Sequence, residues 1–247
     1  MLASGPQLLR NYFAAARMFI RSRAEKRLIT LPLNLTSRNL AFTQQRSDNV
    51  LFTPEEIEAF LDAANERQQL YILLCLNLGA YGSDIGTLKK SEVDLVGGRI
   101  KRQRTKTRGR SKNVPCVDYP LWKRTRRLLE KLIDTSDGEF ALLTEDGLPL
   151  WREVENSEGK FCRLNAVKSA LFHLQHDVMK LAKKDRKPLK SLRKTGATML
   201  ENSVYGRFSE HYLGEAPKTI ASRHYAHKNG SEFDEAILWL GKRLGIE

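Results

Sequence analysis

The chain has 247 residues, the length of one domain with an appendage or of two small domains, and 42 Lys and Arg against 29 Asp and Glu give a formal net charge of +13. Hydrophobic residues make up 41% of it, enough for a buried core, which excludes disorder as the main state. The longest nearly uninterrupted apolar run, residues 70–81, is too short to cross a bilayer, and no signal peptide pattern is present. Three separated cysteines without CxxC spacing argue against a disulfide framework or a cysteine-based zinc site and favour a reducing, intracellular compartment.

The excess positive charge lies in two stretches. Residues 99–127 contain twelve basic residues and one acidic residue, and residues 180–194 contain eight basic residues and one acidic residue. The two stretches therefore carry net charges of +11 and +7, and the rest of the chain is net negative. This clustering favours a polyanionic partner, of which nucleic acid is the commonest, over two solvated basic faces. A membrane surface is a weaker candidate, because neither stretch reads as an amphipathic helix with a large apolar face.

At the start of the chain, apolar residues at helical spacing predict a helix over residues 7–26. Glu25 is its first acidic residue, so the segment also resembles an Arg-rich transit peptide, but no cleavage signal is evident and we favour a structural helix. A polar connector containing Pro and Asn follows. We therefore divide the chain into a helix within 1–30, a linker over 31–50 and a main domain over 51–247.

The main domain opens with helix signals. The segment Thr53-Pro54-Glu55-Glu56 is a capping box with Pro at the first helical position. A second, almost wholly apolar helix is predicted over 70–78 and ends at Gly79. Ser83 can then cap a short helix that runs through Leu88.

A basic β-hairpin is predicted in the middle of the chain. Gly97-Gly98 forms a turn, and residues 99–105 and 113–118 read as two strands around a basic loop. A basic helix over 121–133 follows, and Asp146-Gly147 is a turn signal.

The last third of the domain reads as helical. Asn165 can cap a long helix to residue 183, with Val178 and Leu181 among its inward side chains, and Pro188 breaks the chain after it. Helices precede and follow one small hairpin, and we predict a mostly α domain with a small antiparallel β-hairpin sheet. The remaining predicted helices cover 192–202, 208–213 and 232–244.

Several signals of other chemistry are absent or weak. No GxGxxG or GxxxxGK[ST] segment indicates a nucleotide cradle, and no HExxH segment is present. His224 and His227 lack acidic or cysteine partners at ligand spacing, so we predict no metal site there. Glu92 and Asp94 would suit a metal nuclease, but two carboxylates in a turn are more often solvated.

Four segments resemble, in order, the conserved boxes of the tyrosine recombinases, the phage-type integrases. Any one match is weak, but four in the right order, spread from about residue 52 to the end, are specific. The resemblance implies the catalytic-domain fold of that family. The segments are LNLGAYGSDIGTL (76–88, followed by 91–94), TKT (105–107), KSLRKTGAT (190–198, against the family's HxLRHTxAT), and LGE (213–215) with RHYAH (223–227).

The resemblance implies a role for four residues. Tyr225 is the candidate nucleophile, which attacks a DNA phosphodiester and forms a 3′-phosphotyrosyl intermediate without ATP or metal, so that no cofactor is needed. Arg193 would hold a nonbridging phosphate oxygen, and Lys190, one helical turn earlier, would reach the same phosphate. Lys106 would protonate the leaving 5′-oxygen.

Each role has a plainer alternative. Arg193 can be an ordinary phosphate contact, Lys106 one of many basic loop residues, and Tyr225 a packing residue. Tyr212 is a nearby tyrosine, but it precedes LGE and is therefore misplaced as the nucleophile. The residues we predict to contact double-stranded DNA are Arg102, Arg104, Arg108, Arg110, Lys112, Lys194, Arg223 and His224.

The sequence departs from the family pattern at three positions. Tyr81 stands where the family's first arginine is expected, Lys190 replaces the first histidine of the HxxR box, and Glu215 replaces the histidine of LGH. The segment from Glu215 to Tyr225 is also one residue longer than the commonest spacing. Lys190 is a tolerable exchange, because it can still donate to phosphate, whereas Tyr81 and Glu215 are not conservative.

The cost of these departures sets the expected activity. Losing one preorganised hydrogen-bond donor to the transition state costs about 3–4 kcal/mol, which slows the reaction by a factor on the order of 10²–10³. Enzymes of very slow reactions accelerate them by roughly 10¹⁷ in total. A missing arginine therefore predicts a slow enzyme rather than a dead one, and Arg102 or Arg104 in the hairpin could substitute for it. An anion at Glu215 makes inactivity more plausible.

Two readings of function result: a DNA recombinase that integrates mobile DNA, and a catalytically impaired DNA-binding protein on the same scaffold, a regulator or a decaying integrase. An RNA-associated basic protein fits the order of the four segments less well. The resemblance also implies a core-binding domain, of which only residues 7–27 could be the last helix, as in a natural truncation or a fragment. The segment 232–244 would either dock on a second copy of the chain or pack on its own. We expect a cytoplasmic, nucleoid-associated protein.

Overall fold

A computed structural model describes residues 6–37, 50–104, 114–216 and 230–247, and the chain divides into two compact units, Met1–Asp48 and Asn49–Glu247. The first unit contains α1 (Pro6–Glu25), close to the predicted helix over 7–26. Its apolar side chains Leu9, Tyr12 and Phe19 are exposed within this unit. Over the parts of the chain that the structure describes, no helix is both long and apolar enough for a membrane span.

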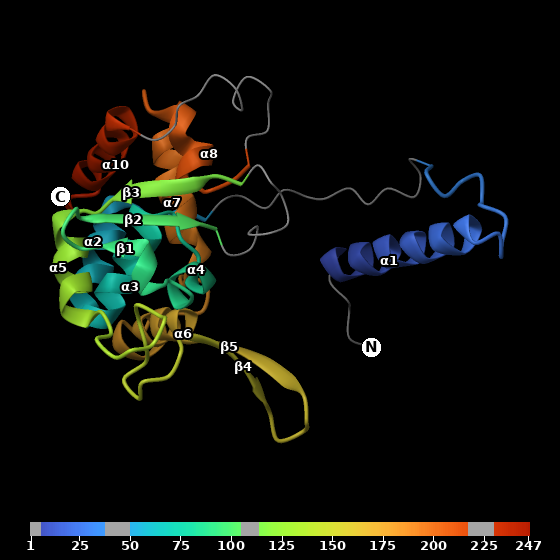
Figure 1. The fold of residues 1–247 in the computed structure, drawn as a ribbon, viewed down its shortest axis with the longest axis horizontal. Coiled ribbons are helices and arrows are strands. Elements are labelled where there is room, and N and C mark those ends of the chain that lie inside the picture. Colours follow the sequence, from blue (N-terminus) through green and yellow to red (C-terminus); the bar gives the residue numbers. More distant parts are fainter. Residues whose placement is uncertain (1–5, 38–49, 105–113, 217–229) are drawn as a thin grey trace. The chain divides into compact units, whose positions relative to one another are not determined.

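The second unit packs helices around one central helix, α3, which contacts α2, α4, α5, α6 and α7 (Figure 1). Every residue from 70 to 77 in α3 is buried, as expected for an almost wholly apolar helix. The predicted class, mostly α with small antiparallel sheets, is confirmed. The elements of this unit are α2 (Pro54–Ala63), α3 (Glu66–Asn77), α4 (Gly82–Gly86), η2 (Lys90–Glu92), β1 (Val93–Asp94), β2 (Arg99–Gln103), β3 (Cys116–Pro120), α5 (Lys123–Leu132), β4 (Trp151–Glu155), β5 (Phe161–Asn165), α6 (Ala166–His173), η3 (Leu174–Val178), α7 (Lys190–Glu201), η4 (Gly206–Phe208), α8 (Ser209–Tyr212) and α10 (Ser231–Arg243).

Capping signals set the starts of the first helices. The predicted capping box of α2 is present, because Thr53 Oγ1 accepts from Glu56 N at 3.2 Å and the Glu56 carboxylate accepts from Thr53 N at 2.8 Å. The helix predicted over 70–78 begins earlier, at Glu66, after a second capping box that starts at Asn65. The predicted cap at Ser83 is wrong: α4 is capped at Tyr81, whose backbone N–H donates to the Asp84 carboxylate at 2.9 Å.

The basic hairpin forms the main sheet, with β1, β2 and β3 antiparallel in that order. Ile100 pairs with Tyr119 and Arg102 pairs with Val117, so these four side chains share the face that packs on the core. Arg102 is therefore buried, although the sequence suggested a DNA contact, whereas Lys101 points to solvent. The loop between β2 and β3, residues 105–113, lies outside the described residues.

Two features of the second half differ from the prediction. A second hairpin, β4–β5, projects from the body of the unit (Figure 1) and was not predicted. The Asn165 cap is present, since its side chain accepts from Lys168 N at 3.0 Å, but the helix does not reach residue 183. It ends at His173 and is followed by the π-helix η3, whose wider turn changes the direction of its own side chains, and Val178, the last residue of η3, is 49% exposed.

The C-terminal helix α10 packs on its own chain. Phe233, Ile237 and Leu240 are buried, and the helix contacts β3 and α7. The indole N–H of Trp122, just before α5, donates to the Ile237 carbonyl at 2.8 Å. The sequence left open whether this segment docks on a second copy or packs on its own, and in this structure it packs on its own chain.

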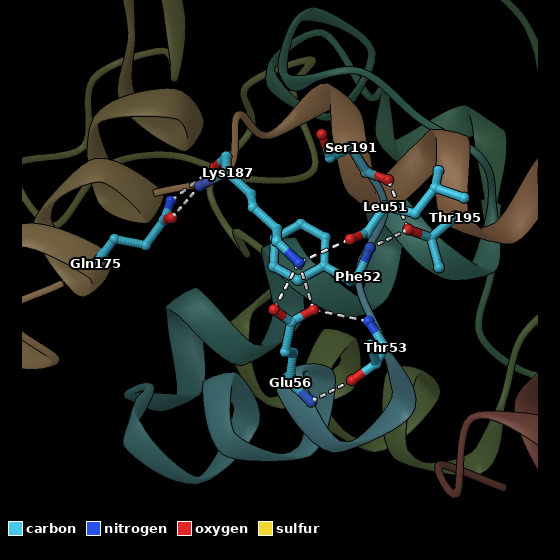
Figure 2. Close-up of polar contacts among 8 residues, drawn as sticks. All are labelled: Leu51, Phe52, Thr53, Glu56, Gln175, Lys187, Ser191 and Thr195. Atoms are coloured by element: carbon cyan, nitrogen blue, oxygen red, sulfur yellow. Dashed lines mark hydrogen bonds and ion pairs between the residues drawn. The ribbon is translucent and has the colours of Figure 1, made fainter. Parts of the chain in front are cut away.

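A polar network joins the first described residues of the second unit, just before α2, to α7 (Figure 2). The backbone N–H of Phe52 donates to Thr195 Oγ1 at 2.9 Å, and the Thr195 hydroxyl donates to the Ser191 carbonyl at 2.9 Å. Thr195 and Ser191 lie one turn apart on α7. The chain segment that leads into α2 is therefore fixed on the same helix that carries Arg193.

Lys187 completes this network from the loop before α7 (Figure 2). Its ammonium group donates to the Leu51 carbonyl at 2.7 Å, contacts both carboxylate oxygens of Glu56 and lies 5.1 Å from the centre of the Phe52 ring. Gln175 holds the Lys187 backbone from the other side, accepting from its N–H at 2.7 Å and donating to its carbonyl at 2.9 Å. Two segments more than 130 residues apart are thus joined through one cation.

Stability should fall at acid pH partly through Glu56. Burial alone raises the pKa of Glu56, but hydrogen bonds from Lys187 and Thr53 outweigh it, and its pKa lies below the ordinary 4.5. The stabilisation is therefore present above pH 4.5 and is lost as the pH falls through the lowered pKa. Urea unfolding at pH 7 and pH 3.5 should show a smaller loss of unfolding free energy in Glu56→Gln than in the wild type. Glu58→Gln, an exposed neighbour in α2, should keep the wild-type loss, and equal losses in all three proteins would contradict this account.

Candidate functional site

Arg193 lies at the junction of three segments that the sequence singled out. It projects from α7, it is 4% exposed, and its guanidinium donates to the Gly79 carbonyl and, at 2.8 Å, to the Leu213 carbonyl. Gly79 has φ 55°, and a Cβ there would lie 2.9 Å from the Tyr212 ring, so the turn requires glycine. The guanidinium therefore joins the turn after α3 to the turn after α8.

Glu215 and Arg104 meet Arg193 at this junction. The Glu215 Oε1 atom lies 3.5 Å from Arg193 Nη2 and 3.3 Å from Arg104 Nη1. The side chains of Arg193 and Arg104 are 4% and 10% exposed, whereas that of Glu215 is 34% exposed. One carboxylate at the surface thus bridges two nearly buried cations.

The ring of Tyr81 belongs to the same cluster. The Arg193 Cζ atom lies 4.5 Å from the ring centre and the Arg104 Cζ atom lies 5.0 Å from it. Both distances are within the range of cation–π attraction. The two positions that depart most from the family pattern, Tyr81 and Glu215, are therefore the ones that contact Arg193. We call the four side chains Tyr81, Arg104, Arg193 and Glu215 the arginine cluster.

The other predicted site residues of this region lie at different depths. Lys190 is exposed in the first turn of α7, one turn before Arg193, and Lys194 is half-buried. The guanidinium of Arg102 donates to the Asp84 carbonyl and lies 3.9 Å from a Glu92 oxygen. Of the two hairpin arginines that the sequence offered as substitutes, Arg104 lies immediately after the end of β2 and reaches the cluster, whereas Arg102 lies within β2 opposite Val117 and is held in the core.

Tyr212 has a structural environment. It is fully buried, its hydroxyl donates to the Leu76 carbonyl at 2.6 Å, and its own carbonyl accepts from the Tyr119 hydroxyl at 3.0 Å. Burial raises the pKa of the Tyr212 phenol above its ordinary value, so the hydroxyl stays protonated. This agrees with the interpretation that Tyr212 is not the nucleophile.

The remaining predicted site residues lie outside the described residues, and their roles stay predictions. Among the residues that the structure does describe, no group of three or more His, Cys, Asp or Glu is placed to hold a metal ion. Sequence reasoning did not foresee that Glu215 bridges two arginines or that Tyr81 lies against both, because no motif encodes either contact. The predicted residues outside the described ranges are Lys106, Arg108, Arg110, Lys112, Arg223, His224 and Tyr225.

The fold is that of tyrosine recombinase catalytic domains. The Tn1549 transposon integrase, solved with a circular intermediate DNA, has a TM-score of 0.60 and 15% identity to this chain, over 96% of this chain and 79% of its own. The integrase of mycobacterium phage Brujita has a TM-score of 0.56 and 13% identity, over 99% and 78%. A lambda integrase dimer bound to a COC′ core site has a TM-score of 0.56 and 16% identity, over 90% and 63%. No protein-family model matches the sequence, and no curated protein matches it closely enough to count as a relative.

Proposed function

We propose that this protein is a site-specific DNA recombinase of the integrase type, which cleaves and rejoins DNA strands through a 3′-phosphotyrosyl intermediate on Tyr225. The observation that carries the proposal is the buried Arg193, fixed by two backbone carbonyls where the turns of the predicted boxes meet. The guanidinium itself is thus held in position before a phosphate arrives, as a preorganised donor to developing charge should be. The expected setting is DNA integration by a mobile element, with the protein on the nucleoid.

Two independent observations support double-stranded DNA as the partner. The described basic residues of the stretches over 99–127 and 180–194 lie on β2, α5 and α7 and in the segments beside these elements, and Arg104 and Arg193 belong to these stretches. The solved structures with the same fold include integrases in complex with DNA. Positive charge of this density binds phosphate backbones by releasing counterions.

The proposed chemistry needs four groups. The Tyr225 hydroxyl loses its proton to water as its oxygen attacks the phosphorus, the bond from phosphorus to the 5′-oxygen breaks, and Lys106 gives a proton to that leaving oxygen. Arg193 and Lys190 stabilise the charge that develops on the nonbridging oxygens. The bond energy is kept in the phosphotyrosyl ester, so the reverse attack by a 5′-hydroxyl rejoins the strand.

A catalytically impaired DNA-binding protein is the second candidate, and one observation favours it. Glu215 places a negative charge within 3.5 Å of Arg193, where a phosphate would carry its own charge. If that carboxylate stays in place, it weakens the contact between Arg193 and the phosphate that is cleaved. Binding is affected less, because basic residues on several other elements also attract DNA.

A nicked suicide substrate distinguishes the two candidates. DNA flanking the gene is incubated with the full chain, and a denaturing gel detects covalent adduct while a parallel titration measures binding between about 50 and 200 mM salt. We expect an adduct and a binding constant that falls steeply with salt, since several phosphates are neutralised. Binding without adduct would favour the impaired protein, and a flat salt response would contradict DNA binding through the basic stretches.

A further inference from the structure

Arg104 and Arg193 bind the same oxygen atom. Both guanidinium groups lie within 3.5 Å of Glu215 Oε1, and both are nearly buried. Two cations brought this close repel each other, and they remain there only if an anion lies between them. The structure supplies that anion from its own chain.

The anion position also suits a phosphate. A phosphodiester carries one negative charge over two nonbridging oxygens, as a carboxylate does, and arginine forks bind both groups. The Glu215 side chain is 34% exposed, so the anion position lies next to solvent rather than inside the core. Arg104 immediately follows the last residue of β2 and precedes Lys106 by two positions in the sequence.

We propose that Arg104 and Arg193 together form a binding site for one phosphate of the DNA backbone and that the Glu215 carboxylate occupies this site when DNA is absent. The ligand class rests on the proposed function, while the paired arginines and their internal anion rest on the geometry. Arg104 then takes the place of the arginine that Tyr81 replaces, and it comes from a different element of the fold. The Tyr81 ring gives both guanidinium groups a neutral aromatic surface to contact. An arginine at position 81 would instead add a third positive charge and increase the repulsion.

The arrangement makes Glu215 a competitor of DNA. A phosphate can enter between the arginines only when the carboxylate leaves, so part of the binding free energy is spent on its displacement. Removing the charge of Glu215 should therefore tighten DNA binding, whereas removing Arg104 should weaken it. These opposite effects separate the proposal from a purely structural cluster, in which both changes would only destabilise the fold.

The test measures binding of a short DNA duplex to the full chain and four variants at several salt concentrations. Glu215→Gln should bind about fivefold tighter, because one like charge next to the phosphate is gone. Arg104→Ala should bind the duplex at least about tenfold more weakly, because a charge-assisted phosphate contact is lost. The slope of log binding constant against log salt concentration should become shallower by about one. The matched controls are Glu235→Gln, an exposed carboxylate on α10, and Lys242→Ala, an exposed cation on the same helix and outside both basic stretches. Both controls should change affinity much less.

Further measurements distinguish a lost phosphate contact from misfolding of the variant and from the use of a DNA duplex that the protein does not recognise. Arg104→Lys, which keeps the charge, should recover part of the lost affinity, and thermal unfolding of each variant identifies any that fail to fold. Stabilisation by inorganic phosphate alone is measured in parallel, and Glu215→Gln should gain more from phosphate than the wild type or Glu235→Gln.

The outcomes separate this proposal from the proposed function. If Glu215→Gln and Arg104→Ala match their controls in DNA binding and in phosphate stabilisation, the two-arginine site is overturned, whatever the suicide substrate shows. If the wild type binds no DNA but the variants show the expected order with phosphate, the anion site holds and the recombinase proposal is overturned.

Discussion

Tyr225→Phe should abolish covalent adduct formation on a nicked substrate and leave noncovalent DNA binding nearly unchanged. The change removes one oxygen atom, which in the proposed reaction is the nucleophile, and keeps the aromatic ring. Loss of the nucleophile leaves no route to a phosphotyrosyl ester, so the adduct band should vanish rather than weaken. The denaturing gel and a binding titration on the same duplex measure the two effects.

Tyr212→Phe is the matched control for that experiment. It removes a buried hydroxyl that donates to the Leu76 carbonyl at 2.6 Å and should lower the unfolding free energy by about 1 kcal/mol. Adduct formation should persist, because this oxygen is buried in the core. An adduct that survives Tyr225→Phe would place the nucleophile elsewhere, and loss of both adduct and binding would give Tyr225 a role in folding instead.

The sequence predicted those parts of the fold that local signals specify. The capping box at Thr53 and the cap at Asn165 were predicted and are present, because each needs only residues within three positions of one another. The β4–β5 hairpin was missed, since charged residues such as Glu153 and Arg163 alternate along it and its apolar residue Phe161 is 76% exposed. A strand without a buried face gives little hydrophobic alternation to detect.

The candidate site was predictable only in part. The order of the four segments predicted that Arg193 is important, and the structure brings it together with the turns at Gly79 and Leu213. Whether Arg102 or Arg104 could substitute for a missing arginine depends on where β2 ends, because Arg102 lies within the strand and enters the core whereas Arg104 follows its last residue. The bridge through Glu215 depends on tertiary contacts with Arg193, 22 positions away, and with Arg104, 111 positions away, and no pattern within the sequence encodes it.

Arg193→Ala should lower the rate of DNA cleavage by about 10²–10³, the cost of one preorganised donor to a developing oxyanion. The same change should also destabilise the fold by about 2 kcal/mol, because the carbonyls of Gly79 and Leu213 lose their donor in a nearly buried site. Single-turnover cleavage, measured below the melting temperature of the variant, separates the two effects. Arg193→Lys should recover less of the rate than of the stability, since an ammonium group restores charge but not the planar fork.

Arg102→Ala is the control that shows how much of the lost cleavage rate in Arg193→Ala comes from destabilising the fold. Arg102 is also nearly buried and also donates to a backbone carbonyl, that of Asp84, but its side chain points into the core below the sheet. Its replacement should destabilise the protein to a similar extent and leave the single-turnover rate within about tenfold of the wild type. If Arg102→Ala and Arg193→Ala slow cleavage equally at equal folded fraction, Arg193 acts through the fold alone. A selective loss in Arg193→Ala would mean that its guanidinium acts on the phosphate.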